Sequence, residues 1–318
     1  MKTKWIILLI SLAFVATVLG CIVKFLRTDD RPKVVIVLKD LDTQYWKIIK
    51  AGAEKGFRDF DIDGKVVAPP YGSEEDVQGY MLEKVLKEHP DVLVISPFES
   101  AVVMSKLKQA VENKIPVLLV STDAPLEHKT AYIGTDNFEL GRKAGELLAS
   151  GLKPGDEVAL ITARNFGGEV LDARIKGAMF SLEGAGIKIV TEKAGLPNKP
   201  ELVRKAMTMI LQEHPDVKGV FATTDIMALS ALEVVKEHAY KMPVIGADGI
   251  IQMVESIEDG TLTGTVAQNP YDMGYISAET ALKIIKGEGV RKTIDTGVDI
   301  ITKDNANQKL DLLQEWLR

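Results

Sequence analysis

Short apolar runs alternate along this chain with segments of helical periodicity, and this alternation restricts the fold more than any other feature. Residues 220–222 form one such run, of the kind found in strands buried on both faces of a parallel sheet. Residues 226–238 follow with apolar side chains at helical spacing. Asp225 lies directly before them and is expected to cap this helix. Because ligands of open α/β sheets lie beyond the carboxyl ends of the strands, Thr224 and Asp225 are expected at the mouth of a cleft.

The alternation of strand and helix continues over most of the chain. Strands are predicted at residues 34–38, 65–68, 92–95, 117–120, 158–161, 187–190, 220–222 and 244–247. Helices are predicted at residues 45–60, 74–88, 100–113, 138–149, 170–183, 201–213 and 226–238. This order predicts an α/β fold with parallel sheets that carry helices on both faces.

A short internal repeat predicts two similar halves. Residues 88–92 and 213–217 share the sequence EHPDV, and each copy ends a predicted helix and begins a predicted strand. The chain has 318 residues, of which 46% are hydrophobic, and this is enough for two compact lobes. The sequence therefore predicts two Rossmann-like lobes.

Charge and composition exclude several function classes. A net charge of −6 and a pI near 5.5 argue against nucleic acid or an anionic membrane surface as a partner. The four histidines form no H-E-x-x-H pair, and the single cysteine excludes a disulfide framework and a cysteine zinc site. We therefore expect no metal and no cofactor.

The amino terminus has the pattern of an export signal. Residues 1–4 are basic, residues 5–19 are apolar, and residues 18–21 read Val-Leu-Gly-Cys. This resembles the signal peptide and lipobox of a bacterial lipoprotein, in which Cys21 becomes the lipidated first residue. The alternative is an uncleaved membrane anchor at residues 5–23, which is long enough to span a bilayer. Both interpretations place the rest of the chain on the outer side of the cytoplasmic membrane, after a linker that ends near residue 30.

Several motifs together indicate a family. In chain order they are residues 132–137 (YIGTDN), 174–177 (RIKG), 214–217 (HPDV), 224–228 (TDIMA), 244–249 (VIGADG) and 265–270 (TVAQNP). With them, the chain from about residue 33 to residue 303 resembles the periplasmic sugar-binding proteins of the ribose/galactose type, which are related to the LacI repressors. The resemblance implies a type I periplasmic binding protein without enzymatic activity.

The resemblance also implies how the chain is divided. The first lobe is expected to comprise residues 31–135 and 269–297, and the second residues 136–268 and 298–303. Three crossovers near Thr135, Gln268 and Gly297 would join the lobes, which would close on the ligand by hinge bending. Residues 304–318 are expected to form a C-terminal helix with an apolar face of Leu310, Leu313, Trp316 and Leu317. This face could pack on the chain's own lobe or contact a membrane partner.

A site for a sugar needs carboxylates, amides and an arginine at fixed points, with aromatic rings as platforms. The resemblance assigns these roles to Asp248, Gln268, Arg174 and Thr224, and it assigns ring stacking to the pair Tyr45 and Trp46. Each residue also has a purely structural alternative. One of the two aromatic rings could pack the first turn of its helix. Arg174 could form a surface ion pair with Glu169 or Asp172, and Asp248 with Gly249 could form a turn.

The first lobe departs from the family pattern at several expected binding positions. Ser121 replaces an aspartate, Thr43 and Ser96 replace asparagines, and Lys39 replaces a small polar residue. Asp123 could substitute for the missing carboxylate. Lys39 could enter the cleft or pair with Asp40 or Asp123. We therefore predict a neutral monosaccharide or similar polyol held mainly by the second lobe, with an acidic or phosphorylated sugar as the alternative.

Two uses of such a binding protein remain open. One is delivery of a sugar to an ABC permease, and the other is presentation of the bound state to a membrane sensor such as a histidine kinase. An enzyme is disfavoured because the chain has no G-x-S-x-G, no Walker loop and no complete G-x-G-x-x-G. A repressor is disfavoured because residues 1–30 are apolar and do not form a helix-turn-helix pattern. The domain that follows the anchor is expected to be a monomer.

Overall fold

The computed structural model describes residues 31–163, 169–197 and 199–318. Residues 33–318 form one compact unit. The predicted lipidation of Cys21 and the alternative anchor at residues 5–23 therefore lie outside the described residues. Within the described ranges, no helix is both long enough and apolar enough to cross a membrane.

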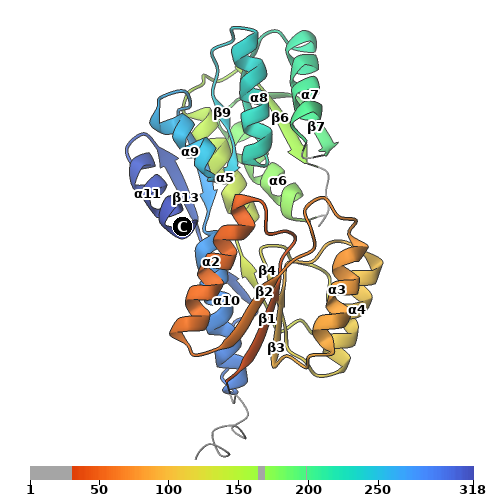
Figure 1. Cartoon of the computed structure of the whole chain (residues 1–318). Coiled ribbons are helices and arrows are strands. Elements are labelled where there is room, and N and C mark those ends of the chain that lie inside the picture. Colours follow the sequence, from red (N-terminus) through yellow and green to blue (C-terminus); the bar gives the residue numbers. More distant parts are fainter. Residues whose placement is uncertain (1–30, 164–168, 198) are drawn as a thin grey trace, which may run out of the picture. The chain divides into compact units, whose positions relative to one another are not determined.

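The first lobe is built on a six-stranded parallel sheet with the order β12-β5-β4-β3-β1-β2. Its strands are β1 (Lys33–Val37), β2 (Asp63–Val67), β3 (Val92–Ile95), β4 (Val117–Val120), β5 (Ala131–Gly134) and β12 (Thr293–Asp295). Its helices are α2 (Gln44–Asp59), α3 (Asp76–Leu86), α4 (Ala101–Glu112) and α10 (Pro270–Ile285). Helices α2 and α10 cover one face of the sheet, and α3 and α4 cover the other (Figure 1).

The strands of this sheet are apolar on both sides because both faces are covered. In β1, Val34 and Ile36 point to the core under α2 and α10, whereas Val35 and Val37 point to the core under α3 and α4. This is the two-residue side-chain period of a strand buried on both faces. At the carboxyl ends of these strands the apolar run stops, and the side chains that follow are free to face a ligand.

The second lobe contains two smaller sheets. A four-stranded parallel sheet has the order β7-β6-β8-β9, and a three-stranded sheet has the order β10-β11-β13. The strands are β6 (Glu157–Ala163), β7 (Lys188–Leu196), β8 (Val217–Ala222), β9 (Val244–Ile245), β10 (Ala247–Asp248), β11 (Gly264–Gln268) and β13 (Val298–Thr302). The helices are α5 (Asn137–Ala149), α6 (Glu169–Gly184), α7 (Pro200–Glu213), α8 (Asp225–Glu237), α9 (Ile251–Glu258) and α11 (Ala306–Trp316).

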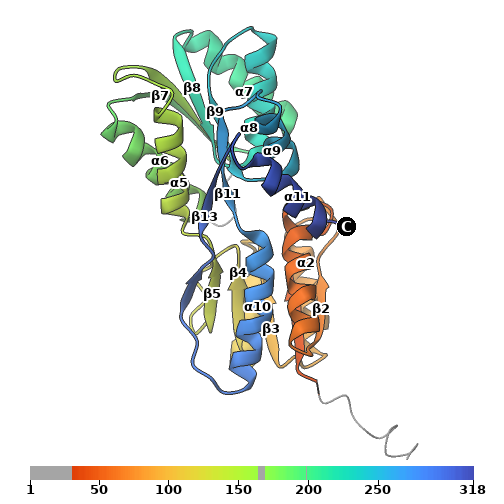
Figure 2. The same ribbon diagram turned by 90° about the vertical axis from the view of Figure 1, so that its left-hand side faces the viewer.

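The chain passes between the sheets of the two lobes three times. It leaves the first sheet after β5, returns to it between β11 and α10, and leaves it again between β12 and β13. Figure 2 shows the second and third of these passages, where β11 leads down into α10 and β13 leads up from the first lobe. Residues 135–136, 269 and 296–297 link the elements at these three passages.

The predicted parallel α/β architecture is confirmed, with one antiparallel pair, β11–β13, that the alternation did not predict. The predicted strands and helices up to residue 245 are present, with shifts of a few residues at their ends, and β7 extends to Leu196. The C-terminal helix packs on the chain itself. Leu313 is buried, and Leu310, Trp316 and Leu317 pack against the second-lobe core. This confirms the first of the two alternatives for its apolar face.

Candidate ligand-binding site

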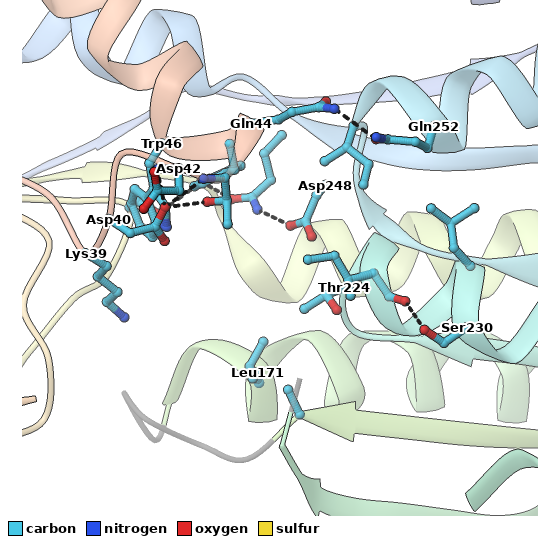
Figure 3. A pocket seen from close by; sticks show the side chains of 18 of the residues that line it. Lys39, Asp40, Asp42, Gln44, Trp46, Leu171, Thr224, Ser230, Asp248 and Gln252 are labelled. Carbon is cyan, nitrogen blue, oxygen red and sulfur yellow. Dashed lines mark hydrogen bonds between the residues drawn. The ribbon is translucent and has the colours of Figure 1, made fainter. Parts of the chain in front are cut away.

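A cavity of about 800 Å³ lies between the lobes, at the carboxyl ends of strands from both. Nine of the residues that the resemblance singled out line it: Lys39, Thr43, Tyr45, Trp46, Ser121, Arg174, Thr224, Asp248 and Gln268. Figure 3 shows Lys39, Asp40 and Trp46 on one side of the cavity, with Thr224 and Asp248 on the other. The position agrees with the general rule that ligands of open α/β sheets bind beyond the strand ends.

Arg174 of α6 is the centre of the polar cluster on the second lobe. Its Nη1 donates to the carbonyl oxygens of Thr223 at 2.7 Å and Ala247 at 3.0 Å, and it lies 3.4 Å from Asp248 Oδ1. Its Nε donates to Asn137 Oδ1 at 2.9 Å. The residue is only 4% exposed, so the alternative of a surface ion pair is wrong. Four partners hold the planar guanidinium in one orientation, which fixes the carboxylate beside it.

Asp248 lies at the end of β10, beside Arg174. Its Oδ1 accepts from Gln268 Nε2 at 2.9 Å, and its Oδ2 accepts from the backbone N–H of Asp225 at 3.2 Å. Burial raises the pKa of Asp248, and the nearby Arg174 guanidinium acts in the opposite direction. Gly249 follows with a φ of +77°, so the chain does turn here, and the turn directs the carboxylate to the cavity wall. An oxygen of Asp248 with a spare lone pair can accept from a ligand hydroxyl.

The prediction for Asp225 is wrong in two respects. The cap of α8 is Thr224, whose hydroxyl oxygen accepts from the N–H of Met227 at 3.3 Å. Asp225 is fully buried below the cavity, and its Oδ2 accepts from the N–H groups of Gly249 at 2.6 Å and Ile250 at 2.8 Å. The carboxylate therefore holds the loop that carries Asp248. Burial, together with the charge of Asp248, raises the pKa of Asp225 to about 7.

Gln268, at the second crossover, joins the two lobes through hydrogen bonds. Its Oε1 accepts from Tyr45 Oη at 3.1 Å and from Thr135 Oγ1 at 3.0 Å, while its Nε2 donates to Asp248. Tyr45 Oη also lies 2.9 Å from Ser121 Oγ. A continuous chain of hydrogen bonds thus runs from Ser121 of the first lobe to the carboxylate of the second.

The aromatic pair forms part of the cavity wall at the start of α2. The rings of Tyr45 and Trp46 meet edge to face, with centroids 5.0 Å apart and an angle of 87° between their planes. Both rings line the cavity, and both pack against the first-lobe core. The Tyr45 ring is anchored through its hydroxyl to Ser121 and Gln268, and the stacking of a ligand on either ring stays a prediction.

Lys39 follows β1 and points into the cavity (Figure 3). Its Nζ lies 5.5 Å from the centroid of the Phe98 ring. Burial lowers the pKa of Lys39 to about 8, and the charges of Glu75 and Glu99 oppose this effect. The proposed pairing with Asp40 or Asp123 is not found. Asp40 Oδ1 instead accepts from the N–H and the hydroxyl of Thr43, at 2.8 and 2.9 Å.

Two of the predicted site residues do not reach the cavity wall. Ser96 is fully buried behind the wall and donates to Thr122 Oγ1 at 3.1 Å. Asp123 forms an ion pair with Lys129 and accepts from the N–H of Ala124 at 2.9 Å. The chain turns sharply after β4, where Ser121 has a φ of +61°. Ser121 therefore faces the cavity, whereas Asp123 does not line it, and Asp123 does not supply the missing carboxylate.

Sequence reasoning missed several lining residues, of which Gln44 is the most informative. Gln44 Nε2 donates to Gln252 Oε1 at 2.9 Å (Figure 3), and Gln44 Oε1 accepts from the N–H of Ile251 at 3.1 Å. These bonds link α2 of the first lobe to α9 of the second. The sequence signal that could have identified Gln44 was its position directly before the aromatic pair, at the start of a helix. In the part of the chain that the structure describes, no group of three or more acidic, histidine or cysteine side chains could hold a metal ion.

Comparison with known proteins gives a consistent result. A profile of the family described as the periplasmic binding protein domain matches residues 34–289. The D-ribose/D-allose-binding protein of Pseudomonas aeruginosa is 28% identical over 295 residues, which span 86% of this chain and 90% of that protein. The ribose import binding protein of Bacillus subtilis is 27% identical over 264 residues, which span 83% of this chain and 85% of that protein.

Solved structures show the same likeness. A glucose-galactose binding protein from Geobacillus stearothermophilus superposes with a TM-score of 0.79 at 26% identity, covering 87% of this chain and 99% of that chain. A carbohydrate transporter solute binding protein from Agrobacterium radiobacter, solved in complex with D-arabinose, has a TM-score of 0.79 at 27% identity. That match covers 90% of this chain and 99% of the other.

Proposed function

Because the chain belongs to the periplasmic binding protein domain family, we propose that it binds a monosaccharide or similar polyol in the cavity between its lobes and closes around it. It is a binding protein and not an enzyme. The proposal depends on one observation above all, the cluster of buried Arg174 and Gln268 with half-buried Asp248, which lines the cavity together with the Trp46 ring. The names of the relatives, which include ribose, allose and arabinose, support a sugar as the ligand.

We propose a role for each side chain of the site from the hydrogen bonds that it can still make to a ligand. Asp248 accepts from ligand hydroxyls, and Arg174 and Gln268 hold its carboxylate in place. Trp46 supplies an apolar face for the C–H side of the sugar ring. Thr224, Thr43 and Lys39 stand at the wall around these groups. The lobes are residues 31–135 with 269–297 and residues 136–268 with 298–303, and they would move about the three crossovers.

The proposed test measures affinity by titration calorimetry over a panel of pentoses, hexoses, inositols and sugar acids. Asp248→Ala should weaken binding at least about tenfold, because loss of one partner of a buried charge pair costs ~2–5 kcal/mol. Asp123→Ala is the matched control, since this carboxylate does not line the cavity. The proposal fails if Asp248→Ala leaves the affinity for a neutral sugar intact. It also fails if only anionic ligands bind and Lys39→Ala abolishes that binding.

As a periplasmic binding protein, the chain acts outside the cytoplasmic membrane. We propose that it is a monomer and that the permease of an ABC importer recognises its closed form. Deletion of the gene should then abolish uptake of the labelled sugar. Intact uptake with lost induction of sugar-responsive genes would instead support the alternative partner, a membrane histidine kinase.

We further propose that the chain is attached to the membrane through lipidated Cys21. Mass spectrometry of the membrane-bound protein should find a mature chain that begins at a diacylated Cys21. Replacement of Cys21 by Ala should leave the precursor uncleaved. A mature species that retains residues 1–20 in the wild type would support an uncleaved anchor instead.

A further inference from the structure

The C-terminal helix α11 contacts both lobes. It packs along α9 of the second lobe and also meets α2 of the first (Figure 2). Trp316, its last residue, stacks on Tyr271 of α10, with ring centroids 4.6 Å apart and an angle of 18° between the ring planes. Because α2 and α10 cover the sheet of the first lobe, the end of α11 lies across the interface between the lobes.

The start of α11 is fixed to the second lobe. Asn305, which precedes the helix, donates from Nδ2 to the carbonyl of Ile300 and accepts at Oδ1 from the N–H of Thr302, both at 2.9 Å. Both partners belong to β13. Lys309 is buried and donates to Asp299 of the same strand at 3.3 Å. The start of the helix therefore moves with the second lobe.

The end of α11 meets the first lobe through apolar groups. Leu313 is buried in the same apolar cluster as Ile48 of α2, which is also buried. Tyr271 of α10 packs against this cluster and stacks on Trp316. Water can replace a hydrogen bond that breaks between the lobes, but it cannot replace these contacts. Separation of the lobes here would expose apolar surface, which is unfavourable in proportion to its area.

Trp316 is held from both lobes. Tyr271 of the first lobe stacks on its ring, and Lys309 Nζ lies 5.9 Å from the ring centroid, within the range of a cation–π contact. Lys309 is in turn held by Asp299 of the second lobe. None of these four residues lines the ligand cavity. The contacts of Trp316 therefore join the lobes independently of the ligand-binding side chains.

We infer that α11 is a brace between the lobes, fixed at its start to β13 and held at its end by the stack of Trp316 on Tyr271, which restricts lobe separation and thereby raises ligand affinity. The inference rests on the proposed function, because it concerns the closure of the lobes on a sugar. The apparent affinity rises in proportion to the population of the form that can bind. Since the brace acts outside the cavity, it changes the affinity for every sugar by the same factor.

The test removes the stack from either side. Trp316→Ala should increase the radius of gyration of the ligand-free protein, measured by small-angle X-ray scattering, and should leave the radius of the ligand-saturated protein at the wild-type value. Calorimetry should find each sugar that binds about threefold to tenfold weaker. Tyr271→Ala removes the same contact and should have the same effect, and the double variant should add little to it. Leu312→Ala, at an exposed position of the same helix, is the matched control and should behave as the wild type.

Trp316→Phe keeps an aromatic ring at the contact and should restore most of the wild-type affinity. If Trp316→Ala and Tyr271→Ala leave the ligand-free radius unchanged, the inference is wrong, and sugar binding by the wild type leaves the proposed function standing. An increased radius with unchanged affinities would overturn the link between the brace and affinity. If the wild type binds no sugar, the proposed function fails, and the radius still decides whether α11 is a brace. One of the two alanine variants is sufficient if the other does not fold.

Discussion

At the scale of single residues, Asp225 has the clearest thermodynamic consequence. Its carboxyl is fully buried and contacts the loop of Asp248, and the only guanidinium of the cluster, Arg174, lies beside Asp248. Two carboxyls therefore share one nearby cation in a medium that disfavours charge. Burial raises the pKa of Asp225 to about 7, compared with an ordinary value of 3.8.

This shift predicts a pH-dependent stability. Between about pH 4 and pH 7 the folded protein keeps a proton that the unfolded chain has released, so the stabilisation is complete below about pH 4 and is lost as the pH rises through about 7. The free energy of unfolding should fall by at most about 1.4 kcal/mol per pH unit from this group. Urea denaturation at several pH values should show a smaller decrease for Asp225→Asn. Asp123→Asn, at a half-exposed ion pair, should keep the wild-type profile, and equal profiles for all three proteins would contradict the prediction.

The sequence predicted much of the site, and its errors concern neighbouring side chains. Thr224 and Asp225 are both good helix caps, so their adjacent positions in the sequence do not decide which one caps the helix. Only the folded chain shows that Asp225 reaches to the N–H of Gly249, on a different loop. Lys39 was similarly ambiguous, because a long side chain at a strand end can turn toward several partners.

At the scale of elements, the predicted strand at residues 244–247 is in fact two short strands, β9 and β10, which belong to different sheets. Strands β5 and β11 and helix α10 were not predicted, and β12 has only three residues, too few to show a period. The antiparallel β13 follows the last crossover, where the alternation of strand and helix ends. Its place beside β11 is fixed by the tertiary fold, because residues far apart in the sequence must first come together.

The C-terminal helix α11 provides a prediction at this scale. Leu313 is 1% exposed against the second-lobe core, whereas its neighbour Leu312 is 38% exposed. Leu313→Ala should reduce the free energy of unfolding by ~2–5 kcal/mol, and Leu312→Ala should reduce it by less than about 1 kcal/mol. Chemical denaturation of the two variants measures both values. Equal effects would mean that the helix does not pack on the chain in solution.

At the scale of the whole molecule, polar links join the lobes in addition to the three crossovers. Tyr45 reaches Gln268 from the first lobe, and Gln44 reaches both Gln252 and the N–H of Ile251 in the second. Each of these hydrogen bonds contributes only a little to the stability of the closed form. The reason is that water can replace the bond when the lobes separate. The equilibrium between the open and closed forms is therefore sensitive to single side chains at the lobe interface.

Gln44→Ala should shift this equilibrium toward the open form. The radius of gyration of the ligand-free protein, measured by small-angle X-ray scattering, should rise, and the ligand should bind about twofold to tenfold more weakly. Gln109→Ala, at an exposed position of α4, is the matched control. An unchanged radius together with an unchanged affinity would show that Gln44 does not hold the lobes together.

The contact of Gln44 with Ile251 also makes one backbone amide a natural reporter of lobe separation. Helix α9 begins at Ile251, and its N-cap Ile250 has no side chain that could accept a hydrogen bond. The acceptor for the Ile251 N–H comes from Gln44, in the other lobe. Each separation of the lobes exposes this amide to solvent, so its deuterium uptake records how often the molecule opens. A ligand that keeps the lobes together would therefore slow that exchange.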